Sequence, residues 1–526
     1  MKFGRVLVAG AGVSGRSAAA ALVADGAEVV VTDANRERLD ALGLPGVRTA
    51  AGLGEPPEGT ELVVTSPGWR PDAPLLAAAA GAGIEVIGEV ELAWRMDQDR
   101  PGGPARWLAV TGTNGKTTTV GMLESILRAA GLDAVACGNV GLPVVDAVRA
   151  GHAVLAVELS SFQLYWSPSV LPHAGAVLNV AEDHLDWHGS MEAYAQAKAQ
   201  VLTGAVAVAG VDDPWAGRLL AESPAPRKIG FTLGEPAHGQ FGVRAGQLVD
   251  RTAGAAPADA EPAGEEAVPA DPTAVPAGGG TVLAADAVPA AGAVPAAGAV
   301  PADGGTGRDG GGAVSVDRTA APADGGAVLA GVADVRPAGS IGLLNALAAA
   351  ALAGAIGVPP EAVRAGLRAF EPGEHRGAVV RDHRGVRYVD DSKATNPHAA
   401  AAALRAAPTA AHPHLGRVVW IAGGRLKGAA VDELVAGNAH RLAGVVLIGA
   451  DRAEIAAALA RHAPDVPVRE VSSGDDGAMV QAVRGAAELA QPGDVVLLAP
   501  AAASMDMFTD YKHRGDAFAA AVRGLP

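Results

Sequence analysis

Short apolar runs alternate along most of the chain with longer stretches in which apolar residues recur every three or four positions. Residues 5–9, 107–110 and 418–424 are examples of the short runs, and residues 120–127 of the longer stretches. A short apolar run bounded by turn residues is typical of a buried strand, whereas the 3.6-residue period is typical of a helix. The alternation therefore predicts an α/β protein built on parallel sheets.

The strand and helix signals fall into three groups, which predicts three domains. Residues 97–104 (DQDRPGGP) are polar and rich in proline and glycine, as interdomain linkers are. A new series of strand signals begins after residue 371. We expect a Rossmann-like domain at 1–102, a central phosphate-loop domain at 103–372 and a second Rossmann-like domain at 373–526.

Residues 251–331 interrupt the predicted central domain with a different composition. They are rich in alanine, glycine, proline and aspartate, repeat the sequence AVPA and show no amphipathic period. Such a segment cannot bury enough apolar surface to offset its ordering entropy. We expect a disordered low-complexity insertion in a surface loop, tolerated because the cost of loop closure grows slowly with length.

Composition narrows the classes of function. A net charge of −16 argues against a nucleic-acid-binding surface. The single cysteine, Cys137, excludes an intrachain disulfide, which fits a reducing compartment. The chain starts directly with a strand signal, and its apolar stretches are too short to span a membrane. We expect a cytoplasmic monomer with no membrane insertion.

Residues 107–119 (WLAVTGTNGKTTT) carry the strongest chemical signal. A buried strand leads into a glycine-bracketed turn, then Lys116 and Thr117, then a helix. This order suits a nucleoside triphosphate, because backbone N–H groups and the helix N-terminus favour phosphate oxygens. Lys116 would reach the β- and γ-phosphates, and Thr117 would coordinate Mg²⁺. Val110 replaces the first glycine of the full motif, so the loop is shortened. An incidental glycine turn is the weaker interpretation, since all three parts follow in order.

The first domain opens with GAGVSG at residues 10–15, followed by a helix and a strand that ends at Asp33. This is the start of a Rossmann-type βαβ unit. The motif alone leaves three interpretations open. It could bind NAD(P) with Asp33 on a ribose, bind the diphosphate of another nucleotide, or use its glycines only for tight packing.

Polar residues follow the strands of the central domain. Glu158 ends one predicted strand and His184 lies just beyond another. In a doubly wound sheet, strand ends face the nucleotide crevice, so these two residues are candidates for Mg²⁺ ligands or acid–base groups. Taken singly, His184 could be a hydrogen-bonded loop histidine, and Lys198, on the next predicted helix, an ordinary surface lysine.

The third domain shows a second pattern of the same kind. The predicted strand 386–389 ends in Asp390 and Asp391, and basic or polar residues follow the strands at 418–424 and 494–498. This arrangement indicates a second crevice at the strand ends.

Together, these motifs resemble the Mur ligases of peptidoglycan synthesis. The resemblance rests on GTNGKTTT, Glu158 with SSFQ, NVAEDHLDWHGS, Lys198, EHR at 374–376, DDSKATN, GGRLKG and the segment from SMDMF to RG. It covers the whole chain outside the insertion. The segments GAGVSG and DDSKATNPHA are most similar to the D-glutamate-adding branch of the family.

The resemblance implies an amide-forming ligase with ATP and Mg²⁺ at two sites. ATP would phosphorylate the L-alanine carboxylate of UDP-N-acetylmuramoyl-L-alanine, and the amine of D-glutamate would then displace phosphate. Such chemistry needs positioning and charge neutralisation more than covalent help.

The resemblance also implies roles for individual residues. Lys116, His184, Lys198 and Arg376 would be catalytic. ATP would be bound by Gly112, Thr113, Asn114, Gly115, Lys116, Thr117, Thr118, Asn345 and Asp391. The metal ligands would be Thr117, Glu158, His184 and a carbamylated Lys198. The UDP group would face Val13, Ser14 and Asp33. Asn139 would contact the substrate. D-glutamate would bind Lys393, Thr395, Lys427, Ser504 and Tyr511.

Two segments depart from the family pattern. Family members usually carry G-x-H-N-x-x-N before the long helix of the central domain, where this chain reads GSIGLLN, with Ile341 and Gly342 at the histidine and first asparagine positions. Ala502 replaces a usual cysteine, which we expect to be harmless. The first departure favours an alternative, a paralogue that binds the UDP-sugar with impaired use of ATP. A folylpolyglutamate synthase relative is a further alternative, although such ligases lack a separate UDP-binding domain.

Overall fold

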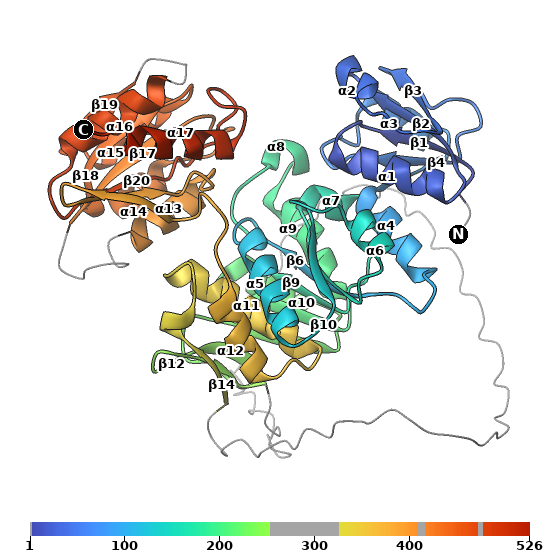
Figure 1. The fold of residues 1–526 in the computed structure, drawn as a ribbon, viewed down its shortest axis with the longest axis horizontal. Coiled ribbons are helices and arrows are strands. Elements are labelled where there is room, and N and C mark those ends of the chain that lie inside the picture. Colours follow the sequence, from blue (N-terminus) through green and yellow to red (C-terminus); the bar gives the residue numbers. More distant parts are fainter. Residues whose placement is uncertain (1–2, 253–325, 408–415, 472–476) are drawn as a thin grey trace, which may run out of the picture. The chain divides into compact units, whose positions relative to one another are not determined.

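The computed structural model describes residues 3–252, 326–407, 416–471 and 477–526. Within them, three sheets follow one another along the chain, each flanked by helices (Figure 1). The prediction of an α/β fold with three Rossmann-like or phosphate-loop units is confirmed. The domain boundaries at residues 102 and 372 remain predictions.

The first sheet has the strand order β3-β2-β1-β4-β5 and is parallel throughout. The reversal of order between β1 and β4 is the position where nucleotides bind in doubly wound sheets. Its elements are β1 (Arg5–Ala9), α1 (Val13–Ala24), β2 (Glu28–Asp33), α2 (Arg36–Asp40), β3 (Val47–Ala51), β4 (Leu62–Thr65), α3 (Pro74–Gly81), β5 (Glu85–Gly88) and α4 (Glu89–Gln98).

The second sheet has the order β14-β13-β12-β11-β10-β9-β6-β8-β7, and only β13 runs antiparallel to its neighbours. Its strands are β6 (Arg106–Thr111), β7 (Ala134–Gly138), β8 (Val154–Glu158), β9 (Ala174–Val177), β10 (Val206–Gly210), β11 (Arg227–Phe231), β12 (Gln240–Arg244), β13 (Gln247–Asp250) and β14 (Ala327–Gly331). Its α-helices are α5 (Lys116–Ala129), α6 (Val144–Ala150), α7 (Ser161–Tyr165), α8 (Leu185–His188), α9 (Met191–Ala199), α10 (Pro214–Glu222), α11 (Ser340–Ala355) and α12 (Pro360–Ala369), with 3₁₀ turns at Gln200–Thr203 and Val332–Asp334.

The third sheet has the order β15-β16-β20-β17-β18-β19, with only β15 antiparallel to its neighbour. Its strands are β15 (Ala378–His383), β16 (Val386–Asp390), β17 (Val418–Gly423), β18 (Leu442–Ile448), β19 (Val468–Glu470) and β20 (Val495–Leu498). Its helices are α13 (Pro397–Ala406), α14 (Asp432–Asn438), α15 (Arg452–His462), α16 (Gly477–Leu489) and α17 (Tyr511–Arg523), with a 3₁₀ turn at Ala439–Arg441.

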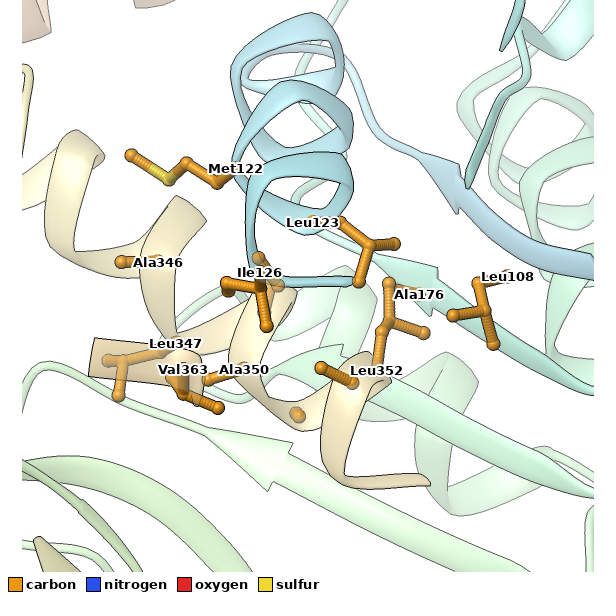
Figure 2. Packing of buried hydrophobic residues seen from close by; sticks show 14 of the residues in the cluster. Leu108, Met122, Leu123, Ile126, Ala176, Ala346, Leu347, Ala350, Leu352 and Val363 are labelled. Atoms are coloured by element: carbon orange, nitrogen blue, oxygen red, sulfur yellow. The ribbon is translucent and has the colours of Figure 1, made fainter. Parts of the chain in front are cut away.

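Helix α5, which follows the phosphate loop, is held in the largest hydrophobic cluster of the second sheet. Its residues Met122, Leu123 and Ile126 are fully buried among side chains of β6, β9, α11 and α12 (Figure 2). The approach of α12 is especially close, because a Cβ added at Gly366 would lie 2.4 Å from the Cα of Ile126. Packing this tight makes α5 rigid, so the phosphate loop leads into a rigid helix.

The predicted insertion at 251–331 is wrong at its C-terminal end. Residues 327–331 form β14, which pairs with β13 and buries Leu329 and Ala330. The sequence GAVLAG resembles the neighbouring AVPA repeats, so composition alone does not reveal this strand. The rest of the predicted insertion, residues 253–325, lies outside the described residues.

Because Asp250 and Ala327 face each other in the β13–β14 ladder, a short turn can join these strands. We expect replacement of residues 253–325 by a four-residue turn to preserve folding and activity. The change halves the length of the loop about four times, and each halving lowers the entropic cost of closing the loop by about 0.6 kcal/mol. The free energy of unfolding should therefore rise by about 2 to 3 kcal/mol. Urea denaturation measures this. A control that also removes β14 should lose stability; equal stability of the two variants would contradict the role given to β14.

Candidate active site

Three neighbouring parallel strands bring the phosphate loop and two of the predicted metal ligands to one edge of the second sheet. Strand β6 pairs with β8 on one side and with β9 on the other. The loop 112–115 follows β6, Glu158 ends β8, and His184 follows β9. The sheet register therefore places these segments together, as the strand-end pattern predicts.

The phosphate loop turns into α5 at Gly115, whose φ of +90° is in the left-handed region. The side chain of Lys116 folds back over the loop, with Nζ donating to the carbonyl oxygens of Gly112 at 2.8 Å and Thr113 at 3.1 Å. Burial lowers the pKa of Lys116, although the carboxylates of Glu158 and Asp183 oppose this shift. A phosphate oxygen would offer this amine a charged partner in place of the carbonyls.

Residues beyond β9 hold the loop in shape, and sequence reasoning missed them. Asn179 accepts a hydrogen bond from Asn114 N at 2.9 Å and donates one to Asn114 O at 3.1 Å. The hydroxyl of Thr113 lies 3.1 Å from that of the buried Tyr194. The available signal for Asn179 was its place at a predicted strand end. Thr113 and Asn114 therefore use much of their hydrogen-bonding capacity within the protein.

Thr117 and Thr118 occupy the first turn of α5. Thr117 is partly buried and Thr118 buried. The Thr118 hydroxyl accepts a hydrogen bond from Arg376 Nη1 at 3.4 Å. The same phosphate loop receives a second contact from the third sheet, because Asn396 Nδ2 donates to Asn114 Oδ1 at 3.0 Å.

Glu158 is a buried carboxylate with one recorded side-chain partner. It is 2% exposed, and its Oε1 accepts a hydrogen bond from Asn139 Nδ2 at 2.9 Å. Asn139 was predicted to contact substrate; the structure places its amide on Glu158, while the residue itself is exposed. The second carboxylate oxygen of Glu158 is thus the one suited to a cation.

Lys198 is 1% exposed, which rules out the interpretation of a surface lysine. Its Nζ lies 4.3 Å from the centre of the Tyr194 ring. Burial, reinforced by the charge of Lys116, lowers the pKa of Lys198 well below its usual value. The environment therefore favours the neutral amine more than water does.

His184 has a φ of +54°, unusual for a residue other than glycine, and immediately precedes α8. Its ring lies 4.8 Å from that of Phe162, and its Nε2 lies 3.5 Å from Asp183 Oδ2. Burial lowers the pKa of His184, and the charge of Asp183 opposes this shift. Strained backbone of this kind is common at functional sites. Asp183, whose charge also acts on Lys116 and Lys198, is a candidate residue that sequence reasoning missed.

Within the described part of the chain, no group of three or more His, Cys, Asp or Glu side chains is placed to hold a metal ion. The predicted set contains only two such residues, Glu158 and His184, together with the hydroxyl of Thr117 and the amine of Lys198. Oxygen donors suit Mg²⁺, and a carbamylated lysine would add two more. The residues therefore fit Mg²⁺ when Lys198 is carbamylated.

Asn345, which was predicted to bind ATP, lies against the phosphate loop. It is 3% exposed, and a Cβ added at Gly115 would lie 2.3 Å from its Oδ1. Gly342 is required by the backbone, because a Cβ there would lie 1.8 Å from Pro337 O. An asparagine side chain at position 342 would therefore not fit this path of the chain.

The predicted D-glutamate residues follow three neighbouring strands of the third sheet, β16, β20 and β17. They are Lys393, Thr395, Lys427, Ser504 and Tyr511. Lys393 Nζ lies 3.8 Å from the centre of the Tyr511 ring. Burial, followed by the charge of Arg376, lowers the pKa of Lys393 to about 8.

Three further features concern the same group of residues. Burial raises the pKa of Asp391 to about 7, and Ser504 is 4% exposed. Lys427 has a φ of +55° and an exposed side chain, and its charge acts on His184. A mixed set of two lysines and hydroxyl groups is suited to a ligand with carboxylates.

In the first sheet, Asp33 braces the glycine-rich loop. Its two carboxylate oxygens accept hydrogen bonds from the backbone N–H groups of Ala11 and Asn35, both at 2.8 Å. Burial works against these bonds, but together they lower the pKa of Asp33. Val13 is 69% exposed and Ser14 partly buried, so both remain accessible to a ligand at the start of α1.

Comparison with known proteins identifies the class. The sequence profile of the Mur ligase middle domain matches residues 110–249, and that of the Mur ligase glutamate ligase domain matches residues 375–502. The chain belongs to the Mur ligase family, whose ATP-dependent ligases build the peptidoglycan precursor.

Within this family, the relatives share one name, UDP-N-acetylmuramoylalanine--D-glutamate ligase. The relative from Nocardia farcinica is 48% identical, over 99% of this chain and 96% of its own. That from Thermobifida fusca is 51% identical, over 99% and 98% respectively.

A solved structure, the UDP-N-acetylmuramate-alanine ligase from Thermotoga maritima, superposes with a TM-score of 0.54 over 99% of both chains at 15% identity, which supports the fold. No helix in the described ranges is long and apolar enough to cross a membrane.

Proposed function

We propose that this protein joins D-glutamate to UDP-N-acetylmuramoyl-L-alanine in an ATP-dependent reaction of peptidoglycan precursor synthesis. The observation that carries the proposal is 48–51% identity over nearly the full length of relatives that bear this activity in their name. The protein would work as a monomer in the cytoplasm, where its single, buried cysteine suits a reducing environment.

The first step transfers the γ-phosphoryl group of ATP to the L-alanine carboxylate, giving an acyl phosphate and ADP. The backbone of residues 112–115 and the ammonium of Lys116 hold the phosphates, and Arg376 neutralises charge that develops on the transferred group. Asn345 lies on the adenine side, and Asp391 binds the ribose.

Mg²⁺ would neutralise phosphate charge at two sites. Thr117 and Glu158 would hold the first ion, and His184 with a carbamylated Lys198 the second. A neutral amine can attack CO₂ and release a proton to give a carbamate, and burial favours the neutral amine of Lys198 by lowering its pKa. The modification turns an amine into a carboxylate-like ligand.

In the second step, the amine of D-glutamate attacks the acyl phosphate, and the tetrahedral intermediate expels phosphate. Lys393 and Lys427 would bind the two carboxylates of D-glutamate, aided by the hydroxyls of Thr395 and Ser504 and by Tyr511. The UDP group would be faced by Val13, Ser14 and Asp33 of the first domain. Asn139 would contact the rest of the UDP-linked substrate. The glycine motif is thus assigned to UDP and not to NAD.

A phosphate-release assay tests the proposal. We expect release to require UDP-N-acetylmuramoyl-L-alanine, D-glutamate, ATP and Mg²⁺ together, with L-glutamate as the matched control. Turnover with L-glutamate but not with D-glutamate would overturn the assignment. An ATP titration in the same assay distinguishes the active ligase from a paralogue with impaired ATP use, which would not saturate at millimolar ATP.

A further inference from the structure

Arg514 of α17 is one of the largest completely buried side chains, with 1% exposure. Its Nε donates to Ser392 Oγ at 3.0 Å and its Nη2 to Ser392 O at 2.8 Å. Its Nη1 donates to Ala502 O at 3.0 Å. Because Ser392 follows β16 and Ala502 follows β20, one guanidinium joins two loops at the edge of the third sheet.

The first of these loops is also fixed to α17 by Ser392 itself. Ser392 is fully buried, and its Oγ donates to the carbonyl oxygen of Tyr511 at 2.8 Å. Its backbone N–H donates to Asp390 Oδ1 at 2.9 Å. Three segments that are distant in sequence therefore meet at Arg514.

Each joined segment carries a residue of the proposed D-glutamate pocket. Lys393 is adjacent to Ser392, Ser504 lies two residues after Ala502, and Tyr511 precedes Arg514 by nearly one helical turn. The proposed ATP contact in this region, Asp391, belongs to the β16 loop alone. A change in the distance between the loops would thus affect D-glutamate more than ATP.

We propose that Arg514 is a positioning residue for the amino-acid substrate, one that fixes the spacing of the loops after β16 and β20 without touching D-glutamate. This inference rests on the proposed function. The planar guanidinium offers donors in a fixed fork, which a lysine ammonium cannot reproduce. Burial lowers the pKa of Arg514 to about 10, so the side chain still carries its charge at neutral pH.

The test compares Arg514→Lys and Ser392→Ala with Arg523→Lys, which changes an exposed arginine on the same helix. We expect Arg514→Lys to raise the KM for D-glutamate about tenfold and Ser392→Ala about threefold. The KM values for ATP and for UDP-N-acetylmuramoyl-L-alanine should stay within twofold, and Arg523→Lys should match the unmodified protein.

Trapping with hydroxylamine provides a second readout, because it intercepts the acyl phosphate without D-glutamate. We expect unchanged trapping in both variants. An equal rise in all three KM values, reduced trapping, or an unchanged KM for D-glutamate would overturn the role.

A thermal melt identifies a variant that does not fold. If Arg514→Lys does not fold, the KM values of Ser392→Ala test the positioning role. If the unmodified protein prefers another amino acid, the proposed function fails, and the KM for that amino acid tests Arg514 separately.

Discussion

Lys198→Ala is expected to lower kcat by about 100-fold or more, since loss of even an outer partner of a metal ligand costs about 10- to 100-fold. The side chain is completely buried beside Tyr194 and Lys116, where a surface role is impossible. Once carbamylated, it would add a negative charge to this part of the site. Alanine removes that charge and leaves a space of about the size of the removed group.

Addition of a small carboxylate should therefore restore part of the activity of Lys198→Ala. Acetate is expected to do so, and acetamide, which has the same shape without the charge, is not. The unmodified protein should gain activity when bicarbonate is added after removal of CO₂. Rescue by both compounds, or a variant as active as the original, would show that Lys198 supplies no carboxylate.

Lys116→Ala is expected to lower kcat by about 100- to 1,000-fold, the loss typical for removal of one preorganised donor to developing charge. In the structure this ammonium lies over the loop, bonded to the carbonyls of Gly112 and Thr113. These are weak partners compared with phosphate oxygens, so the amine is available for ATP. Steady-state phosphate release measures the effect.

Lys228→Ala is the matched control, because Lys228 is exposed and bonded to a helix carbonyl outside the site. It should retain full activity. A melting temperature close to that of the unmodified protein would show that Lys116→Ala still folds. Less than a fivefold loss of kcat in the folded variant would contradict the role of Lys116.

Features set by local pattern were accessible from the sequence. The strand, glycine turn and helix around Lys116 appear where periodicity and turn residues predict them. The position of Glu158 beside this loop also followed, because the ends of parallel strands share one edge. The resemblance to the family supplied the roles of these residues.

Features set by contacts between distant residues were not accessible. The bonds between Asn114 and Asn179 and the bracing of Ala11 by Asp33 depend on how separate strands are placed. The burial of Lys198 likewise depends on the packing of α9, which a nine-residue helix with little amphipathic character does not reveal. Strand β14 was hidden because its composition matches that of the segment before it.

The contact between α12 and α5 has a consequence for which mutations this protein tolerates. Gly366 is not one of the residues that would meet substrate, yet its Cα hydrogen occupies space that no larger group can share with the backbone of Ile126. Any other residue at position 366 would press on the helix that begins with Lys116. In an unbiased screen for inactive alleles, codon 366 should therefore appear among those of the phosphate loop. Smaller side chains in the facing helix should not restore activity, because the added group would meet backbone atoms of Ser125 and Ile126.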